Sequence, residues 1–510
     1  MFQKMRVLLL SLVAIMLLAA CGGGSKDGGE AAPVKDTLVV GQGADAKSLD
    51  PHATNDQPSS RVSAQIYDRL VEADLDMNIV PGLAESWEQP DDLTTIFKLR
   101  EGVKFHNGEE LKASDVKFTI DRMVASPTVH HIIQAVDSVE VVDDYTVKIS
   151  TKQPFGALLN HLSHTAASIL NEKAVTEMGD NYGQTPVGTG PYAFVKWDAG
   201  DKVVLKANDD YFRGAPEIKN VIFRNITEGT NRTIGLETKE VDIAYDIEPI
   251  DKGAVIDNPD LTLTEEPSLS MAYIGFNMKK EEFKNAKVRE AISHAIKVDD
   301  IIEAVLMGAG SPANSPIGPK VFGHNPDVKA PAYDVELAKQ LLAEAGYPNG
   351  FKTSIWTNDN PVRVQICQIV QAQLKEIGID MSIEIVEWGA YLDGTSRGDH
   401  DMFILGWVTV TGDADYGLYA LFHSSTHGGA GNRSFYSNDK VDELLDQAKS
   451  STDPEARRAL YGEIQVILQE ELPVRTLYYQ THNAGMQNNV EGFHLHPAGH
   501  HKIYGVSFKK

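Results

Sequence analysis

Apolar residues recur along this chain with two periods, and each period predicts a different element. Short alternating or continuous apolar runs predict β-strands at residues 37–41, 94–100, 192–197, 221–225, 273–277 and 381–385. Longer runs with helical spacing predict helices at residues 62–71, 337–345 and 366–377, and one helix from Val288 that Gly308 ends. Since strands and helices alternate throughout, the predicted fold class is mixed α/β.

Residues 81–122 carry the most detailed local pattern. Within the predicted strand, Ile96 and Phe97 face opposite sides of the pleat. Asn107-Gly108 predicts a tight hairpin turn, because these residues accept the positive φ angles that such turns need. Ser114-Asp115 then predicts the start of a helix with apolar positions at 116, 118, 120 and 123.

This ordered string, PGLAESWEQPDDLTTIFKLREGVKFHNGEELKASDVKFTIDR, resembles the signature region of the extracellular solute-binding proteins of family 5. That family serves ABC transporters for dipeptides, oligopeptides, nickel and glutathione. Two shorter strings, SLDP at residues 48–51 and GTGPY at residues 188–192, are similar to further family elements. A match over some forty ordered positions is more specific than any short motif.

The resemblance implies a two-lobed periplasmic-binding-protein-like fold, of type II in its large three-domain form, which closes around a ligand by hinge bending. A first domain would comprise residues 36–80, 189–294 and 486–510. A second domain would comprise residues 81–188, and a third would comprise residues 295–485. Residues 1–20 would be a signal peptide and residues 21–35 a tether.

The N-terminus predicts a lipoprotein. Lys4 and Arg6 precede an apolar core at residues 7–18, which is too short to span a bilayer, and Cys21 follows two alanines as in a lipobox. Cys21 would become the diacylated first residue, with the Gly-rich stretch 22–33 as a flexible tether. The alternative is an ordinary secretory signal with a chance cysteine. We therefore expect a lipid-anchored protein that faces the periplasm or the cell exterior.

Composition narrows the function further. The 510 residues carry a formal charge of −25, and removal of Lys4 and Arg6 would make the chain more negative still. So acidic a body argues against nucleic-acid binding and against electrostatic adsorption to anionic lipid. Cys367 is the only other cysteine and falls in a helical pattern between Ile366 and Ile369, which predicts a buried residue rather than a reactive thiol.

The resemblance places the ligand at a Gly-Trp pair, here in the loop 406–416. Trp407 offers a flat wall, the strand edge offers backbone groups, and Asp413 and Asp415 offer charge for a cation. The alternative makes Trp407 a core residue and the two acids turn-formers. The predicted ligand-binding residues are Ser48, Trp388, Tyr391, Trp407, Val408, Thr409, Val410, Asp413, Asp415 and Arg433.

One position departs from the family pattern. Many peptide-binding members carry, three residues after this tryptophan, an aspartate that holds the ligand's ammonium, and Val410 stands there instead. Two pocket arginines of the oligopeptide binder fall on Thr395 and Ile404. The string 411–415 looks most like the glutathione-binding branch. We therefore expect a small peptide or a glutathione-like ligand whose amine reaches Asp413 or Asp415.

Other functions remain as alternatives. A nickel or nickel-chelate binder of the same fold is one, because His423, His427, His494, His496, His500 and His501 gather near the C-terminal part of the chain. However, His496-Pro497 matches a structural turn of the family, so we predict neither a metal nor a cofactor. A secreted hydrolase and a purely structural lipoprotein are the others; no H-E-x-x-H or paired-cysteine pattern supports an enzyme. The expected partners are an ABC permease pair and the membrane, with the protein itself a monomer.

Overall fold

The computed structural model describes residues 35–54, 56–428 and 431–509. Residues 37–510 fold as one compact unit, and the description below concerns that unit. The predicted signal peptide, Cys21 and the stretch 22–33 lie outside the described residues. Among the residues that are described, no helix combines the length and the apolar character that crossing a membrane requires.

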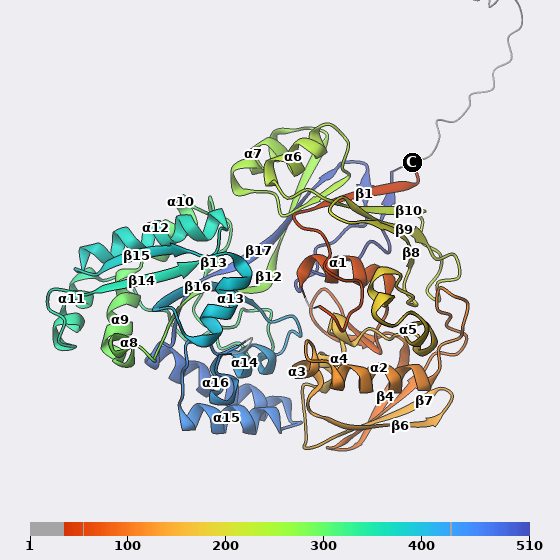
Figure 1. Ribbon diagram of the computed structural model, residues 1–510, viewed down its shortest axis with the longest axis horizontal. Helices are drawn as coiled ribbons and strands as arrows, with labels where there is room; N and C mark the ends of the chain where they lie inside the picture. Colours follow the sequence, from red (N-terminus) through yellow and green to blue (C-terminus); the bar gives the residue numbers. More distant parts are fainter. Residues whose placement is uncertain (1–34, 55, 429–430, 510) are drawn as a thin grey trace, which may run out of the picture. The chain divides into compact units, whose positions relative to one another are not determined.

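A mixed sheet of 11 strands forms the backbone of this unit, in the order β15-β14-β16-β12-β17-β11-β1-β10-β9-β8 with β13 attached to β17 (Figure 1). Its strands are β1 (Thr37–Gln42), β8 (Tyr192–Asp198), β9 (Lys202–Ala207), β10 (Asn220–Asn225), β11 (Ile243–Tyr245), β12 (Leu261–Phe276), β13 (Ser311–Pro312), β14 (Lys352–Thr357), β15 (Asp380–Ile385), β16 (Met402–Val408) and β17 (Val474–Gln487). Five of the six predicted strands are confirmed within these elements, and the sixth, at residues 94–100, is confirmed in the separate sheet described below.

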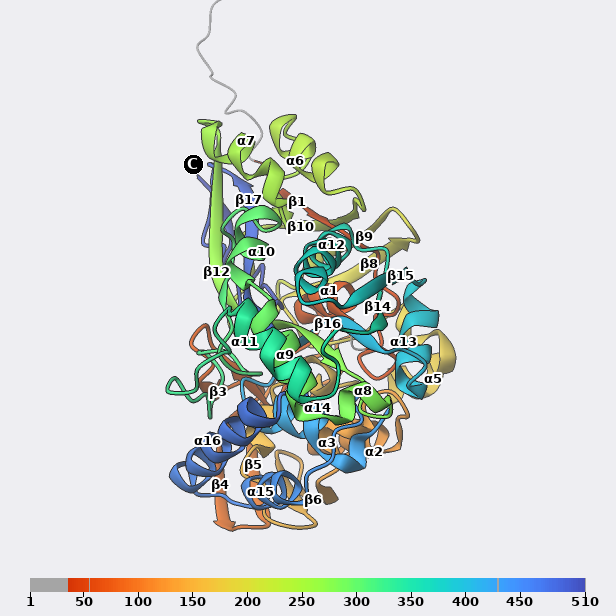
Figure 2. The same ribbon diagram turned by 90° about the vertical axis from the view of Figure 1, so that its left-hand side faces the viewer.

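Two long antiparallel strands, β12 and β17, cross from one half of the unit to the other (Figure 2). Their pairing is interrupted between Pro267 and Met271, where the register shifts. Such a bulge bends a strand and disrupts its pairing locally, and we call this break the hinge. We call residues 37–267 and 481–509 the first lobe, and residues 271–479 the second lobe.

We propose an earlier boundary between the lobes than the expected one, because one hydrophobic core continues across residues 294 and 295. Phe283, Val288 and Ile292 are buried in the same core as Ile355 and Leu374 of the second lobe. The expected junction at residues 294 and 295 would divide that core. A boundary at residues 268–270 keeps it whole, and the corresponding boundary on β17 lies near residue 480.

A separate antiparallel sheet in the first lobe contains the signature stretch. It consists of β4 (Ala84–Asp91), β5 (Thr94–Leu99), β7 (Thr146–Thr151) and β6 (Val136–Asp143). Phe97 is fully buried and Ile96 is half-buried on the opposite face, as the alternation predicts. The turn at Gly108 is confirmed: its φ is +87°, and its N–H donates to Phe105 O at 2.8 Å.

The helices bear out the predicted spacing with three corrections at their ends. Those of the first lobe are α1 (Gln57–Ile66), α2 (Ala113–Ala125), α3 (His130–Ile133), α4 (Leu158–Leu162), α5 (Glu172–Met178), α6 (Gly229–Glu237) and α7 (Lys252–Asp257). Those of the second lobe are α8 (Glu281–Lys284), α9 (Ala286–Ala295), α10 (Val298–Ala304), α11 (Val335–Glu344), α12 (Pro361–Glu376), α13 (Trp388–Arg397), α14 (Ala420–Phe422), α15 (Asp439–Lys449) and α16 (Pro454–Glu471).

The first correction concerns α1, which ends at Ile66 rather than at Val71. Tyr67 is extended, and Leu70 O accepts the N–H groups of Gly82 and Ala84, so tertiary pairing replaces the last predicted turns. Gly190 donates its N–H to Ile66 O at 2.8 Å and so covers the helix end.

The other two corrections are local. Ser114 does not cap α2, because the helix begins at Ala113 and the Asp115 side chain accepts the Lys112 N–H at 3.0 Å. The single helix predicted from Val288 is two helices, α9 and α10, because Ile296 and Lys297 adopt extended backbone angles between them.

Short strands and turns of helix complete the described elements. Two small sheets pair β2 (Val71–Ala73) with β3 (Ile79–Pro81) and β18 (Val490–Glu491) with β19 (Ser507–Phe508). Short 3-10 helices lie at Thr165–Ala167, Gly179–Gln184, Pro249–Asp251 and Ser424–Thr426, and a π-helix lies at Asp415–Tyr419.

Candidate functional site

A cavity of about 370 Å³ opens between the lobes beside the hinge, and we call it the chamber. The first lobe contributes α1, the segment from Asp246 to Lys252, and residues 481–483 in the part of β17 that lies in this lobe. The second lobe contributes β16 and the N-terminal turns of α12. A cavity of this size with walls from both lobes suits a small extended molecule.

The strand β16 presents its two faces to different surroundings. Gly406 and Val408 line the chamber, whereas Trp407 on the opposite face lies 5.6 Å from the ring of Tyr416. Trp407 therefore does not line this chamber, although its buried Nε1 has no hydrogen-bond partner among the described residues. Val408 lines it as predicted.

One edge of β16 is open above the point where β14 stops pairing with it. The β14 pairing covers only Met402 and Phe403, whereas β12 pairs with β16 as far as Val408. Beyond Phe403, no strand of the described chain covers the β14-side edge. The backbone groups of that edge are positioned to pair with an extended ligand.

Arg363 stands beside this open edge. It lies in the first turn of α12, and its Nη2 is 3.9 Å from the point where a Cβ on Gly406 would lie. Nη1 donates to Asn358 Oδ1 at 3.0 Å, and the guanidinium lies 5.5 Å from the ring of Trp388. Among the described residues Arg363 has no carboxylate partner. The absence of a side chain at Gly406 keeps the space beside this cation open.

The other cations of the chamber are neutralised. Arg61 forms a two-pronged ion pair with Asp246, with distances of 2.8 and 3.2 Å. Burial raises the pKa of Asp246, but Arg61 outweighs burial and holds it below its ordinary value. Lys252 pairs with Glu265 at 2.5 Å. Among the described residues that line the chamber, Arg363 is therefore the cation without a carboxylate partner.

Asp413, one of the two acids expected to meet the ligand, is already paired. Its two oxygens accept hydrogen bonds from Arg457 at 2.7 and 3.0 Å, and the side chains are only 2% and 5% exposed. Arg457 also donates to Tyr461 OH at 3.0 Å. Asp413 thus joins the loop 411–416 to α16, and the structure does not present it to the chamber.

Asp415, the second acid, faces the first lobe rather than the chamber. Its Oδ2 lies 3.4 Å from Nε2 of His161 on α4, and both side chains are buried. Asn160 of the same helix donates to Thr411 O at 3.1 Å, and Thr452 donates to Asp92 Oδ1 at 3.0 Å. These contacts join α4 and the β4–β5 turn to the second lobe (Figure 1).

The remaining predicted site residues have structural partners. Tyr391 is fully buried and donates to Ile404 O at 2.7 Å, and Trp388 stacks on it with ring centres 5.7 Å apart. Arg433 donates to Leu392 O at 2.6 Å, so it holds α13. Ser48 accepts the Asp50 N–H at 3.1 Å and donates its own N–H to Ser59 Oγ of α1 at 3.5 Å, but it does not line the chamber.

Two further residues of the predicted loop belong to its turn. Thr409 is buried and donates its N–H to Leu269 O at 3.1 Å. Val410 is half-buried against the core that also contains Tyr391 and Leu418. With Trp407 outside the chamber, the structure brings only Val408 and, through Arg363, Trp388 to the chamber or its edge.

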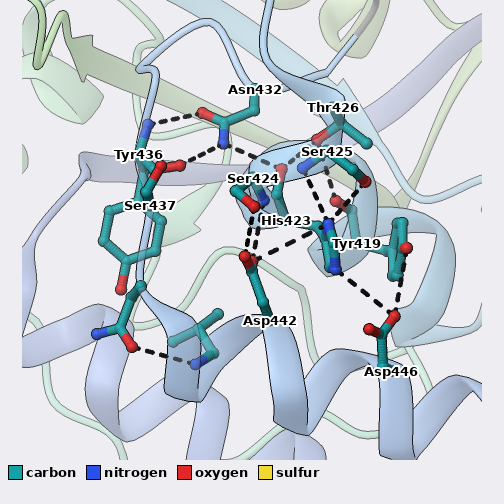
Figure 3. A network of polar contacts seen from close by, with 12 residues as sticks. Tyr419, His423, Ser424, Ser425, Thr426, Asn432, Tyr436, Ser437, Asp442 and Asp446 are labelled. Atoms are coloured by element: carbon teal, nitrogen blue, oxygen red, sulfur yellow. Dashed lines mark hydrogen bonds and ion pairs between the residues drawn. The ribbon is translucent and has the colours of Figure 1, made fainter.

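A polar network fixes the segment that follows this loop (Figure 3). Asp442 accepts from the backbone of Ser424 at 2.9 Å, and Asn432 donates to His423 O and to Tyr436 O at 3.2 and 2.8 Å. The ring of His423 stacks on Tyr419 with centres 4.3 Å apart. The network anchors the segment on α15, which steadies the second lobe's side of the interlobe contact.

Three of the histidines considered for a metal have backbone groups as partners. His496 Nε2 lies 3.2 Å from Ala73 O, His501 Nδ1 accepts the His496 N–H at 2.9 Å, and His427 Nε2 lies 2.8 Å from Tyr436 O. Within residues 35–54, 56–428 and 431–509, no group of three or more His, Cys, Asp or Glu side chains is arranged to hold a metal ion.

Cys367 is buried in α12, as its sequence pattern predicts, and burial raises the pKa of its thiol to about 12. A thiol with such a pKa is almost wholly protonated near neutral pH and is a poor nucleophile.

Gly394, Ser396 and Gly398 have the G-x-S-x-G spacing of a hydrolase nucleophile. That motif requires a sharp turn between a strand and a helix. Ser396 lies in the last turn of α13, and Gly398 ends the helix with a φ of +83°. The local structure is therefore a helix C-terminus and not a nucleophile elbow.

Sequence reasoning missed Arg363 and Arg61. A signal for Arg363 was present: a cation in the first turn of a helix is disfavoured by the helix dipole, so an arginine two residues after Pro361 calls for a functional reason. Arg61 carried no comparable signal, because its role depends on Asp246, which is 185 positions distant in the sequence.

Comparisons with known proteins show the family of this chain and its fold. The family described as "Bacterial extracellular solute-binding proteins, family 5 Middle" matches residues 78–429. The chain is 33% identical over 499 residues to the glutathione-binding protein GsiB of Escherichia coli O157:H7, with 95% of each chain covered.

Two solved structures are similar over nearly the whole chain. The periplasmic binding protein DppA from Helicobacter pylori, in complex with the peptide STSA, superposes with a TM-score of 0.84 at 32% identity, covering 93% of this chain and 98% of that one. NikZ from Campylobacter jejuni, in complex with Ni(L-His), superposes with a TM-score of 0.82 at 25% identity, covering 93% and 99%.

Proposed function

Because this chain belongs to family 5 of the bacterial extracellular solute-binding proteins, we propose that it captures a short peptide or a glutathione-like solute for an ABC importer. The family consists of binding proteins, so the chain is not an enzyme. The observation that carries the choice of solute is the unpaired Arg363 beside the open edge of β16. A guanidinium in that position binds a carboxylate bidentately while the strand edge pairs with peptide groups.

The opposite wall of the chamber supports a zwitterionic solute. Glu248, from the first lobe, lines the chamber and is 3.8 Å from Arg232. Burial raises the pKa of Glu248, although Arg232 opposes that shift. A ligand ammonium near Glu248 would favour its charged form. The solute would then hold the second lobe through its carboxylate and the first lobe through its amine, and this replaces Asp413 and Asp415 as the expected amine partners.

The delivery step and the anchor follow from the sequence and the family rather than from the described residues. We place the protein outside the cytoplasmic membrane, held there by lipid on Cys21, with the permease pair of an importer as its partner. Fractionation of a Cys21→Ala variant tests the anchor: the variant should leave the membrane fraction, and one that remains bound would contradict lipidation at this residue.

Calorimetry with defined solutes tests the ligand class. Reduced glutathione, the tetrapeptide Ser-Thr-Ser-Ala, the same tetrapeptide with an amidated C-terminus, and the nickel–histidine complex would each be titrated into the mature protein. We expect binding of glutathione or the free tetrapeptide and weaker binding of the amide. Binding of the nickel complex alone would contradict the proposal.

Two variants test whether the solute binds in the chamber. Arg363→Ala should weaken binding by about tenfold to a hundredfold, since hydrogen bonds to charged groups contribute about 1.5–3 kcal/mol. Arg397→Ala is the matched control, because Arg397 is an exposed arginine of the same lobe. Equal affinity of the amide and the free peptide, together with unchanged affinity in Arg363→Ala, would exclude the carboxylate site.

A further inference from the structure

The contact between His161 and Asp415 joins the two lobes, and its hydrogen-bond geometry determines where protons must lie. His161 Nδ1 lies 2.6 Å from the carbonyl oxygen of Ile132. A carbonyl oxygen only accepts, so Nδ1 carries a hydrogen. In a neutral imidazole, Nε2 then has a lone pair, and that lone pair would face Asp415 Oδ2 at 3.4 Å.

A lone pair and a carboxylate at this distance repel each other, and the pair becomes attractive only when Nε2 also carries a proton. Neither Nε2 of His161 nor Oδ1 of Asp415 has another hydrogen-bond partner among the described residues. Both side chains line a cavity of about 80 Å³ between the lobes, which gives protons access to the pair. The contact therefore requires an imidazolium and a carboxylate.

A second histidine–aspartate contact, which lies within the second lobe, has the hydrogen of the neutral imidazole on the other ring nitrogen (Figure 3). His423 Nδ1 accepts the N–H of Ser425 at 3.0 Å, so its neutral form carries the hydrogen on Nε2, which faces Asp446 at 3.5 Å. That contact is attractive without an added proton. The difference between the two pairs lies in what each Nδ1 faces.

Two further histidines and a tyrosine face His161. Burial lowers the pKa of His164 to about 3 and also lowers that of His131, so both are neutral near pH 7. Tyr416 packs edge-on against His161, with ring centres 6.1 Å apart.

On the second lobe, the charges keep Asp415 ionised. Burial acts to raise the pKa of Asp415, but the hydrogen bond with His161 and the charges of Lys449 and Arg457 lower it below its ordinary value. The carboxylate is thus held in its ionised form, ready to pair with an imidazolium.

We propose that His161 and Asp415 form a proton-dependent latch, so that closing the lobes takes up one proton at His161 Nε2. The role of the latch rests on the proposed function, because closing the lobes would trap the solute between them. The closed form binds one proton more than the open form, so closure is favoured at lower pH and weakens as pH rises.

Fluorescence energy transfer between the lobes tests the latch without any solute. Asp137 on β6 and Glu443 on α15 are exposed and would be replaced by cysteine for labelling, while Cys367 is buried. The closed-to-open ratio of the mature protein should fall between pH 6 and pH 8, by at most about tenfold per pH unit for one linked proton. His130→Asn is the matched control, because exposed His130 also faces a carbonyl through Nδ1, at 2.8 Å from Val124 O.

Two variants separate a proton-dependent latch from simple loss of packing. His161→Asn keeps a donor toward Ile132 but cannot take up the proton, so its closure should not depend on pH. Asp415→Asn supplies an amide N–H that neutral Nε2 can accept, so at pH 8 it should be more closed than the wild type.

A pH-dependent ratio that persists in His161→Asn, or an Asp415→Asn variant less closed than the wild type at pH 8, would overturn the latch. Calorimetry with reduced glutathione and the tetrapeptide is a separate measurement. If neither binds while closure still depends on pH as described, the solute assignment fails and the latch stands.

Discussion

Replacing Asp413 by asparagine distinguishes a structural acid from a ligand-binding one. The change removes the negative charge that two hydrogen bonds, of 2.7 and 3.0 Å, join to the buried Arg457. Removing one partner of such a pair leaves a buried charge without compensation and costs about 3–5 kcal/mol. Arg457 keeps its bonds to Tyr461 OH and Ala448 O, so we expect a loss of about 3 kcal/mol.

The assay is urea unfolding of the solute-free protein, followed by near-ultraviolet circular dichroism. Asp399→Asn is the control, because Asp399 forms an exposed pair with Arg397, and its loss should change the free energy of unfolding by less than about 1 kcal/mol. Replacing both members, Asp413→Leu with Arg457→Met, should recover much of the lost stability. A loss below about 1 kcal/mol in Asp413→Asn, together with at least tenfold weaker solute binding, would refute the structural role.

Three further outcomes are expected from single sites. Gly406→Ala should bind solute nearly as the wild type does, since its Cβ would lie 3.9 Å from Arg363, whereas Gly406→Val should weaken calorimetric binding at least tenfold by filling the chamber. Burial acts to raise the pKa of Glu72, but Arg69 and Lys502 outweigh burial and lower that pKa to about 2. The ionised carboxylate should therefore contribute roughly 3 kcal/mol to the free energy of unfolding above about pH 4.5, and this contribution should be lost as the pH falls toward 2. Acid titration of Glu72→Gln should lack this loss. A thiol reagent should label Cys367 only after unfolding, and rapid labelling of the native protein would contradict its burial.

The sequence predicted those elements whose pattern is local. Strands such as β5 and the turn at Gly108 follow from alternation and from the residues that positive φ requires. The end of α1 could not be found in this way, because backbone pairing of Leu70 with Gly82 and Ala84 overrides helical spacing. The forty-residue resemblance supplied the architecture that these local patterns could not.

The candidate site was harder to predict because its chemistry depends on partners far apart in the sequence. Asp413 and Asp415 look available for a ligand when the loop is considered alone. The structure pairs them with Arg457 and with His161, on α16 and α4. The family resemblance predicts Trp407 at the ligand, whereas the alternation of a strand directs Trp407 and Gly406 to opposite faces, and only Gly406 lines the chamber.

The central claim is that a solute bearing a carboxylate binds between the lobes, against Arg363 and the open edge of β16. An experimental structure of the protein with its bound solute tests this most directly. We predict a solute carboxylate within about 3 Å of the Arg363 guanidinium and solute backbone groups paired with residues 405–408. A solute bound elsewhere, for example between Trp407 and Tyr416 with no contact to Arg363, would contradict the account.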